Sequence, residues 1–144
     1  MRVFSAYGAG LRRQVVWDIC AKALANPLLH LRGTGAESRD FIHASDVARA
    51  LLLLSGSASF SGEVYNLASG KETTIGELAL RLIHLLGRDV PIAFDGIQTP
   101  GDPLRWQADI SLIRGLGFAP KMALREGLRE VATWSLSELG GSAK

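Results

Sequence analysis

Apolar residues recur every three or four positions in several stretches of this chain, which is the spacing that buries one side of a helix. In the first stretch, apolar side chains fall broadly on one side from Gln14 to Ala25, and Asn26-Pro27 ends it. The same spacing returns four more times along the chain. It predicts helices over residues 14–25, from 46 to a small polar loop at 55–62, over 74–86, over 109–116 and over 124–139.

Local signals mark where two of these helices begin. Thr74-Ile-Gly-Glu77 has capping-box spacing, in which each side chain bonds the backbone N–H of the other residue. Ser45 or Asp46 is expected to cap the preceding helix, because either oxygen can accept a bond from the first turn. These signals fix two helix starts more firmly than apolar spacing alone.

Short runs of strand-forming residues lie between the predicted helices. Within residues 39–43, alternation places Arg39, Phe41 and His43 on one face and Asp40 and Ile42 on the other. Strands and helices that alternate in this way indicate an α/β protein. Strands are predicted over residues 2–5, 28–31, 39–43, 64–67, 91–94 and 104–108, with a turn at 100–103.

A glycine turn precedes the strand at 39–43. Gly33 and Gly35 can adopt the positive φ angles that a tight turn needs. Arg39 follows on a predicted strand, and its planar guanidinium suits a bidentate bond to phosphate. The turn, the arginine and the capped helix together indicate a phosphate-bearing ligand.

Composition narrows the class of protein. The chain has 144 residues, of which 47% are hydrophobic, which suits one domain with a sizeable core. Its longest apolar run, 50–54, is far shorter than the roughly 18 residues of a membrane span. Cys20 is the one cysteine, so an internal disulfide and a multi-cysteine metal site are excluded, and we expect a buried thiol and no metal. These features indicate a cytoplasmic protein with no membrane partner.

Charge adds a preference for anions without indicating nucleic acid. The formal net charge is +2, and arginine supplies twelve of the sixteen basic residues. Arginine is well suited to phosphate, although an arginine-rich surface is also common. The arginines are scattered, and no aromatic residues interleave with them in a basic stripe. Nucleic acid is therefore not expected as a partner.

Five blocks of sequence together resemble the NAD-dependent epimerase/dehydratase family, the nucleotide-sugar members of the extended short-chain dehydrogenases. The segment RDFIHASDVARA is similar to the family's RD-F/Y-hydrophobic-H-V-x-D-V-A-x-A. The other four blocks occur in the family's order and at about its spacing. They are RVFSAYGAG, EVYNLASGKETTIGELA, PGDPLRWQADISLIRGLGFAP and LREGLREVATW, and they cover nearly the whole chain.

The resemblance implies that residues 1–144 are a carboxy-terminal portion without the amino-terminal NAD-binding half. The sequence has no G-x-x-G-x-x-G after a strand. Neither Tyr7 nor Tyr65 has a lysine four residues later, because Leu11 and Ser69 stand there. The expected fold is a small mixed α/β substrate-binding lobe, with a few strands that would complete the parent Rossmann-type sheet.

By the same resemblance, the strands at Val3 and Val64 would lose their partners in the isolated chain. Unpaired strand edges promote association. We therefore expect the chain alone to be marginally stable, oligomeric or prone to aggregate.

The resemblance also assigns site residues. Arg39 matches an arginine that contacts the diphosphate, although a salt bridge to Asp40 or another acid is its ordinary alternative. Asp102 belongs to the P-G-D loop and would orient an arginine or bind a ribose hydroxyl, or else stabilise its own turn. His43 is assigned a structural role. Substrate-binding candidates are Ser5, Gln14, Arg39, Phe41, Asp102 and Arg105, and the cofactor-side candidates are Val3 and Phe4.

Three departures from the family pattern affect these assignments. Gln98 and Thr99 stand where many relatives carry a second phosphate-binding arginine, so Arg105 is either its substitute or a solvated residue. Ser5 replaces an asparagine and reaches less far, and Ala9 stands where a proline usually follows Tyr-Gly. Phe41 is equally well explained as a core aromatic. Gln14 could contact a base edge, although a glutamine on a helix surface more commonly has no such role.

The function implied is the nucleotide-sugar-binding portion of an NAD(P)-dependent epimerase, dehydratase or reductase. In the intact parent, hydride would transfer between a sugar carbon and the cofactor. Catalytic residues are expected in no part of this chain, which alone should neither turn over substrate nor bind NAD or NADP tightly. Its expected partners are a nucleotide-diphosphate sugar, the amino-terminal half and a second subunit of the parent.

Two other functions remain open from the sequence. One is a portion of an extended short-chain dehydrogenase that acts on a non-nucleotide alcohol. The other is a free-standing binding or interaction module. Arg39 favours the nucleotide-sugar function over the first, because a non-nucleotide alcohol carries no diphosphate.

Overall fold

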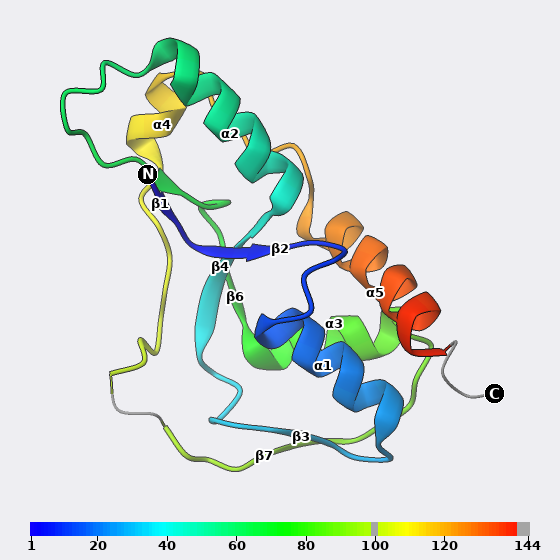
Figure 1. The fold of residues 1–144 in the computed structure, drawn as a ribbon. Helices are drawn as coiled ribbons and strands as arrows, with labels where there is room; N and C mark the ends of the chain where they lie inside the picture. Colours follow the sequence, from blue (N-terminus) through cyan, green and yellow to red (C-terminus); the bar gives the residue numbers. More distant parts are fainter. Residues whose placement is uncertain (99–100, 141–144) are drawn as a thin grey trace.

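In a computed structural model, the described residues form an α/β fold with three small sheets and five helices. Figure 1 shows how these elements are arranged. The structure describes residues 1–98 and 101–140. The strands are β1 (Arg2–Val3), β2 (Ser5–Tyr7), β3 (Leu29–Leu31), β4 (Ser38–His43), β5 (Asn66–Leu67), β6 (Glu72–Thr74) and β7 (Ile92–Phe94). The helices are α1 (Gln14–Ala25), α2 (Ala44–Ser57), α3 (Ile75–Leu85), α4 (Ser111–Gly115) and α5 (Leu124–Gly140).

Most pairings between strands are parallel. β1 pairs with β5, β3 with β7, and β2 with β4, while β6 adds to the other edge of β4 in the antiparallel direction. Strands far apart in sequence therefore meet, as the α/β prediction requires. The chain changes sheet at Phe4, whose N–H bonds the Leu67 carbonyl at 3.0 Å just before β2 begins beside β4.

Strand β4 separates two hydrophobic cores. Phe41 packs with α1, α3 and α5, whereas its neighbour Ile42 faces the other way and packs with α2, β5 and α4. The predicted alternation along residues 39–43 is therefore confirmed for these two residues, which are 4% and 1% exposed. Figure 1 shows the two groups of helices at opposite ends of β4.

Several helix predictions are confirmed, and one cap is corrected. Helix α1 has the predicted bounds, and α3 begins with the predicted capping box of Thr74 and Glu77. The cap of α2 is His43 rather than Ser45 or Asp46, because β4 continues directly into the helix and the His43 ring accepts the Ser45 N–H. Helix α2 also extends to Ser57, into the region predicted as a loop.

The strand predictions need two corrections. Residues 104–108 form no strand. The Leu104 carbonyl accepts the Ser38 N–H, the Ala108 N–H donates to the Asp40 carboxylate, and the Gln107 side chain donates to the Gly70 carbonyl. Strand β6 was missed because its three polar residues show no apolar alternation. Strands β1 and β5 pair with each other, with Arg2 opposite Asn66 and Val3 opposite Leu67, and the described residues add no third strand to this sheet.

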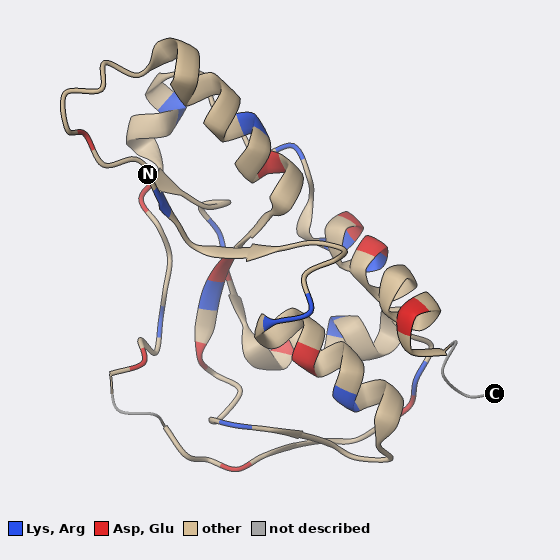
Figure 2. Cartoon of the chain, viewed as in Figure 1, with Lys and Arg blue, Asp and Glu red and all other residues tan. Residues whose placement is uncertain are grey.

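Charge and hydropathy show no concentrated pattern on this fold. Lysine and arginine are dispersed among acidic residues along α1 and α5, whereas the second half of α2 carries neither (Figure 2). Within residues 1–98 and 101–140, no helix has the length and apolar character needed to cross a bilayer. Within the same ranges, no group of three or more metal-ligating side chains gathers.

Candidate ligand-binding cavity

A cavity of about 610 Å³ opens between the start of α1, the ends of β3 and β4, and the segment after β7. This volume falls in the range of small-molecule sites. Among the sequence-predicted site residues, Ser5, Gln14, Arg39 and Asp102 line it. Their positions come from four separate parts of the chain. The other lining residues are Val15, Asp18, Lys22, Leu31, Arg32, Gly33, Glu37, Ile75, Ile97, Gln98 and Leu104.

Arg39 is held on the cavity wall by carbonyl oxygens rather than by an acid. Its Nη1 donates to the Ser38 carbonyl at 2.9 Å and to the Pro103 carbonyl at 2.8 Å. Among the described residues, no carboxylate lies within ion-pair distance of its guanidinium. The alternative of a salt bridge to Asp40 is therefore wrong, and the charge of Arg39 is available to an anion.

Asp40 is a structural residue. Its carboxylate is fully buried and accepts four bonds: from the Ser69 N–H and hydroxyl, the Gly70 N–H and the Ala108 N–H, at 2.7–3.2 Å. These bonds join β4 to the loop after β5 and to the segment before α4. Asp40 thereby fixes the backbone on which its neighbour Arg39 is carried.

The glycine turn before β4 is stabilised from within. Gly33 and Gly35 have φ angles of 85° and 82°, as the sequence predicted. The Glu37 carboxylate accepts the Thr34 and Gly35 N–H groups and the Thr34 hydroxyl at 2.9–3.1 Å. Desolvation acts to raise the pKa of Glu37, but these bonds outweigh it and leave the pKa below its usual value. Glu37 therefore occupies the N–H groups of Thr34 and Gly35, and Asp95 accepts the Gly33 N–H. An anion in the cavity would have to be bound by basic side chains such as Arg39.

Gln14 is held in an unusual conformation where it lines the cavity. Its φ is 68°, in the left-handed region that costs an ordinary residue roughly 1–2 kcal/mol. The preceding Arg13 provides no side-chain cap for α1. Backbone strain of this kind collects at ligand sites, and here it falls on the cavity wall. The role of Gln14 toward a ligand stays a prediction.

Phe41 and Arg105 lie away from the cavity. Phe41 is 4% exposed and stacks edge-on against Tyr7 at 6.2 Å, so it is a core aromatic. Arg105 forms an ion pair with Glu72 instead of replacing the missing arginine. Arg105, and then the Ser38 hydroxyl, lower the pKa of Glu72. Neither Phe41 nor Arg105 lines the cavity, and the structure gives no support to a substrate contact at either position.

Two basic residues on the cavity wall were not identified from the sequence. Lys22 pairs with Asp18 at 2.8 Å, one turn earlier on α1. Arg32 follows β3 and, among the described residues, has no carboxylate within 4 Å. Its place between a predicted strand and the glycine turn was the available signal. Arg32 and Arg39 therefore supply positive charge to the same cavity.

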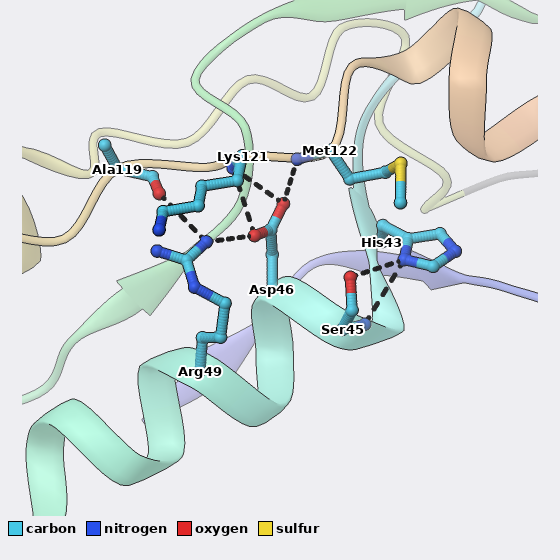
Figure 3. A network of polar contacts seen from close by, with 7 residues as sticks. All are labelled: His43, Ser45, Asp46, Arg49, Ala119, Lys121 and Met122. Carbon is cyan, nitrogen blue, oxygen red and sulfur yellow. Dashed lines mark hydrogen bonds and ion pairs between the residues drawn. The ribbon is translucent and has the colours of Figure 1, made fainter.

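The rest of the RDFIHASD segment stabilises the fold. Asp46 is 1% exposed and accepts the Lys121 and Met122 N–H groups at 2.9–3.1 Å, with Arg49 at 2.5 Å (Figure 3). His43 Nδ1 accepts the Ser45 N–H at 3.3 Å, which agrees with the structural role predicted for this histidine. These contacts attach α2 to β4 and to the segment before α5.

Tyr7 does not offer an acid or base at neutral pH. Burial, followed by the charges of Asp46 and Glu130, raises its pKa well above the usual value. Its hydroxyl therefore stays protonated, beside Gly127 on α5. The position of Tyr7 in the core agrees with its lack of a lysine partner in the sequence.

Comparisons with known proteins agree with this geometry. Residues 1–68 match the model of the NAD dependent epimerase/dehydratase family. The chain is similar to this family over these residues, which make up just under half of its length. It is 35% identical to a putative GDP-L-fucose synthase 2 of Oryza sativa subsp. japonica over 113 residues, covering 77% of this chain and 32% of that protein. It is 32% identical to a putative UDP-glucose 4-epimerase of Methanocaldococcus jannaschii over 113 residues, covering 78% and 36%.

Solved structures of epimerase/dehydratase relatives share the fold. MoeE5 in complex with UDP-glucose and NAD matches with a TM-score of 0.85 at 28% identity, covering 96% of this chain and 46% of that one. The α/β class and the Rossmann-type relationship predicted from the sequence are thereby confirmed. The chain spans about a third of the length of the two curated relatives named above, at 32% and 36%.

Proposed function

We propose that this chain is the nucleotide-sugar-binding portion of an NAD(P)-dependent epimerase, dehydratase or reductase. The observation that carries the proposal is the position of Arg39, which lines the 610 Å³ cavity with no ion-pair partner among the described residues. A nucleotide diphosphate supplies the anion that such a guanidinium binds. The relatives named above, a GDP-L-fucose synthase and a UDP-glucose 4-epimerase, support the same ligand class.

Each lining residue has a role in this proposal. Arg39 binds the diphosphate, and Arg32 adds a second positive charge in place of the arginine missing before Pro100. Asp102 accepts a ribose hydroxyl, because a carboxylate would repel phosphate. Gln14 bonds the edge of the base, and Ser5 bonds the sugar. The Ser38 and Pro103 carbonyls hold the Arg39 guanidinium in place without the competing negative charge of an acid.

The residues of this chain could contact only part of the cofactor. NAD or NADP supplies the hydride acceptor for oxidation of a sugar carbon. Val3 is 38% exposed and Phe4 is half-buried, so both offer apolar surface that can pack against a nicotinamide ring. Neither can hold a pyrophosphate. We propose that tight cofactor binding, the catalytic tyrosine and lysine, and turnover need the amino-terminal half that precedes this portion in the parent.

The proposal extends to the setting of the parent enzyme. We propose that it acts in the cytoplasm and forms a homodimer, with the present chain as its carboxy-terminal portion. Nothing in the cavity favours the two other functions kept open from the sequence. A non-nucleotide alcohol would leave Arg39 and Arg32 facing the ligand without an anion to bind.

Calorimetry on the wild-type chain and on Arg39→Ala tests the phosphate contact. UDP, GDP and dTDP identify the base, and uridine measures binding without phosphate. Bonds to a charged group contribute about 1.5–3 kcal/mol, so we expect Arg39→Ala to weaken diphosphate binding about 10- to 150-fold. Uridine binding should not change.

Arg81→Ala is the matched control, because Arg81 lies exposed on α3 and away from the cavity. It should bind UDP like the wild type. Diphosphate binding that survives Arg39→Ala removes Arg39 from the site. A wild-type chain that is folded by circular dichroism and binds none of the nucleotides refutes the proposed ligand class.

A further inference from the structure

Trp106 contacts both Phe4 and Arg39, and we refer to these three residues as the Trp106 stack. The Trp106 and Phe4 ring centroids are 5.5 Å apart with an interplanar angle of 60°. The second contact is with Arg39, whose Cζ lies 5.4 Å from the Trp106 ring centroid. The three residues come from the junction of β1 and β2, from β4 and from the segment before α4. Trp106 remains 41% exposed, although a tryptophan gains most by burial.

The stack completes the placement of the Arg39 guanidinium. Its Nη1 is already engaged by the Ser38 and Pro103 carbonyls. Two bonds at one nitrogen still allow the planar group to tilt. A tryptophan ring within about 6 Å attracts the cation and restricts that tilt. Among the described residues Nε and Nη2 make no hydrogen bond, so their N–H groups can serve a ligand in the cavity that Arg39 lines.

We propose that Trp106 is a positioning residue for Arg39 and so raises the affinity of the cavity for a nucleotide diphosphate. The inference rests on the proposed function for its ligand. Trp106 does not line the cavity itself, so it acts through the arginine. An arginine side chain loses rotamer freedom when it binds, and holding it beforehand reduces that cost. Tryptophan suits this role better than phenylalanine, because its ring attracts cations more strongly.

The structure predicts a graded loss of binding. Trp106→Leu removes the aromatic face and should weaken UDP binding about 2- to 30-fold. Trp106→Phe keeps an aromatic ring and should lose less. Uridine binding should stay at the wild-type level in both variants, since the arginine serves the phosphates alone.

A double-mutant cycle tests whether Trp106 acts through Arg39. In an Arg39→Ala background, Trp106→Leu should cause no further loss of UDP affinity. Trp134→Phe is the matched control, because Trp134 pairs with Trp17 between α1 and α5, away from the cavity. It should leave UDP binding unchanged. Equal losses with and without Arg39, or wild-type UDP binding by Trp106→Leu, would overturn the inference.

Fluorescence supplies a readout that does not depend on the ligand. The chain has three tryptophans, so Trp17→Phe/Trp134→Phe leaves Trp106 as the sole emitter. Adding Arg39→Ala to this variant should shift the Trp106 emission, whereas Arg81→Ala should not. An unchanged emission overturns the stack. A shifted emission in a chain that binds no nucleotide supports the stack and counts against the proposed function alone.

Discussion

Asp40→Asn should destabilise this protein strongly, because the buried carboxylate of Asp40 joins three segments of the chain. One of its oxygens accepts the Ser69 N–H and hydroxyl, and the other accepts the N–H groups of Gly70 and Ala108. An asparagine amide keeps one acceptor and turns an N–H group toward two donors. Two bonds to a charged acceptor, at about 1.5–3 kcal/mol each, give a loss of roughly 3–6 kcal/mol. That is a large part of a typical stability of about 5–15 kcal/mol.

Urea unfolding followed by far-UV circular dichroism at neutral pH measures this loss. Asp18→Asn is the control, because Asp18 forms an exposed ion pair with Lys22 on α1. It should cost no more than about 0.5 kcal/mol. If Asp40→Asn stays within about 1 kcal/mol of the wild type, the buried carboxylate does not hold the three segments together.

Three further predictions concern the turn, the acid limb and association. Gly35→Ala should lower the free energy of unfolding, measured with urea, more than Gly10→Ala does. Both glycines have positive φ, but a Cβ at Gly35 would lie 2.6 Å from the Phe94 ring, whereas a Cβ at Gly10 would have no other atom within 4 Å. Equal losses of unfolding free energy in the two variants would show that the Phe94 ring moves aside without cost. Glu72 has a lowered pKa, so its contribution is complete above the unfolded value of about 4.3 and is lost as the pH falls through the folded value. The melting temperature of Glu72→Gln should therefore fall less than that of the wild type between about pH 5 and pH 3, and parallel curves would contradict this. Sedimentation velocity should show self-association of the chain, because β1 and β5 form a two-stranded sheet among the described residues and Leu52 and Phe60 are 74% and 75% exposed. A monodisperse monomer with a cooperative melt would refute it.

Local chemistry explains which elements were predictable. Helix α1 and the capping box of α3 depend on residues within one or two turns of each other, so the sequence places them correctly. The segment at 104–108 resembles a strand in composition, but its Ala108 N–H bonds Asp40, which lies 68 residues earlier. Bonds over such distances are fixed by the fold, and no local pattern indicates them.

The residues of the cavity can likewise be divided into those that a motif indicates and those that only the fold brings there. Ser5, Gln14, Arg39 and Asp102 were named by comparison with family motifs, and the structure brings all four to one cavity. Their roles toward a ligand remain predictions. The sequence suggests Arg105 as a substitute for the missing arginine. In the fold, however, Arg105 bonds Glu72, which lies 33 residues away in sequence. Arg32, which no motif identified, lines the cavity, and we propose that it takes the place of the missing arginine.

The most recognisable segment of the chain owes most of its pattern to folding. Of its central residues, Asp40 and Asp46 bond backbone N–H groups of distant segments, Phe41 and Ile42 fill separate cores, and His43 caps α2. Among them, Arg39 alone faces the cavity. A protein could therefore keep this pattern almost intact and yet change its ligand by altering Arg39, or Trp106 beside it. Resemblance across the segment is strong evidence for the fold, whereas evidence for the nucleotide sugar depends on one guanidinium and the residues that hold it.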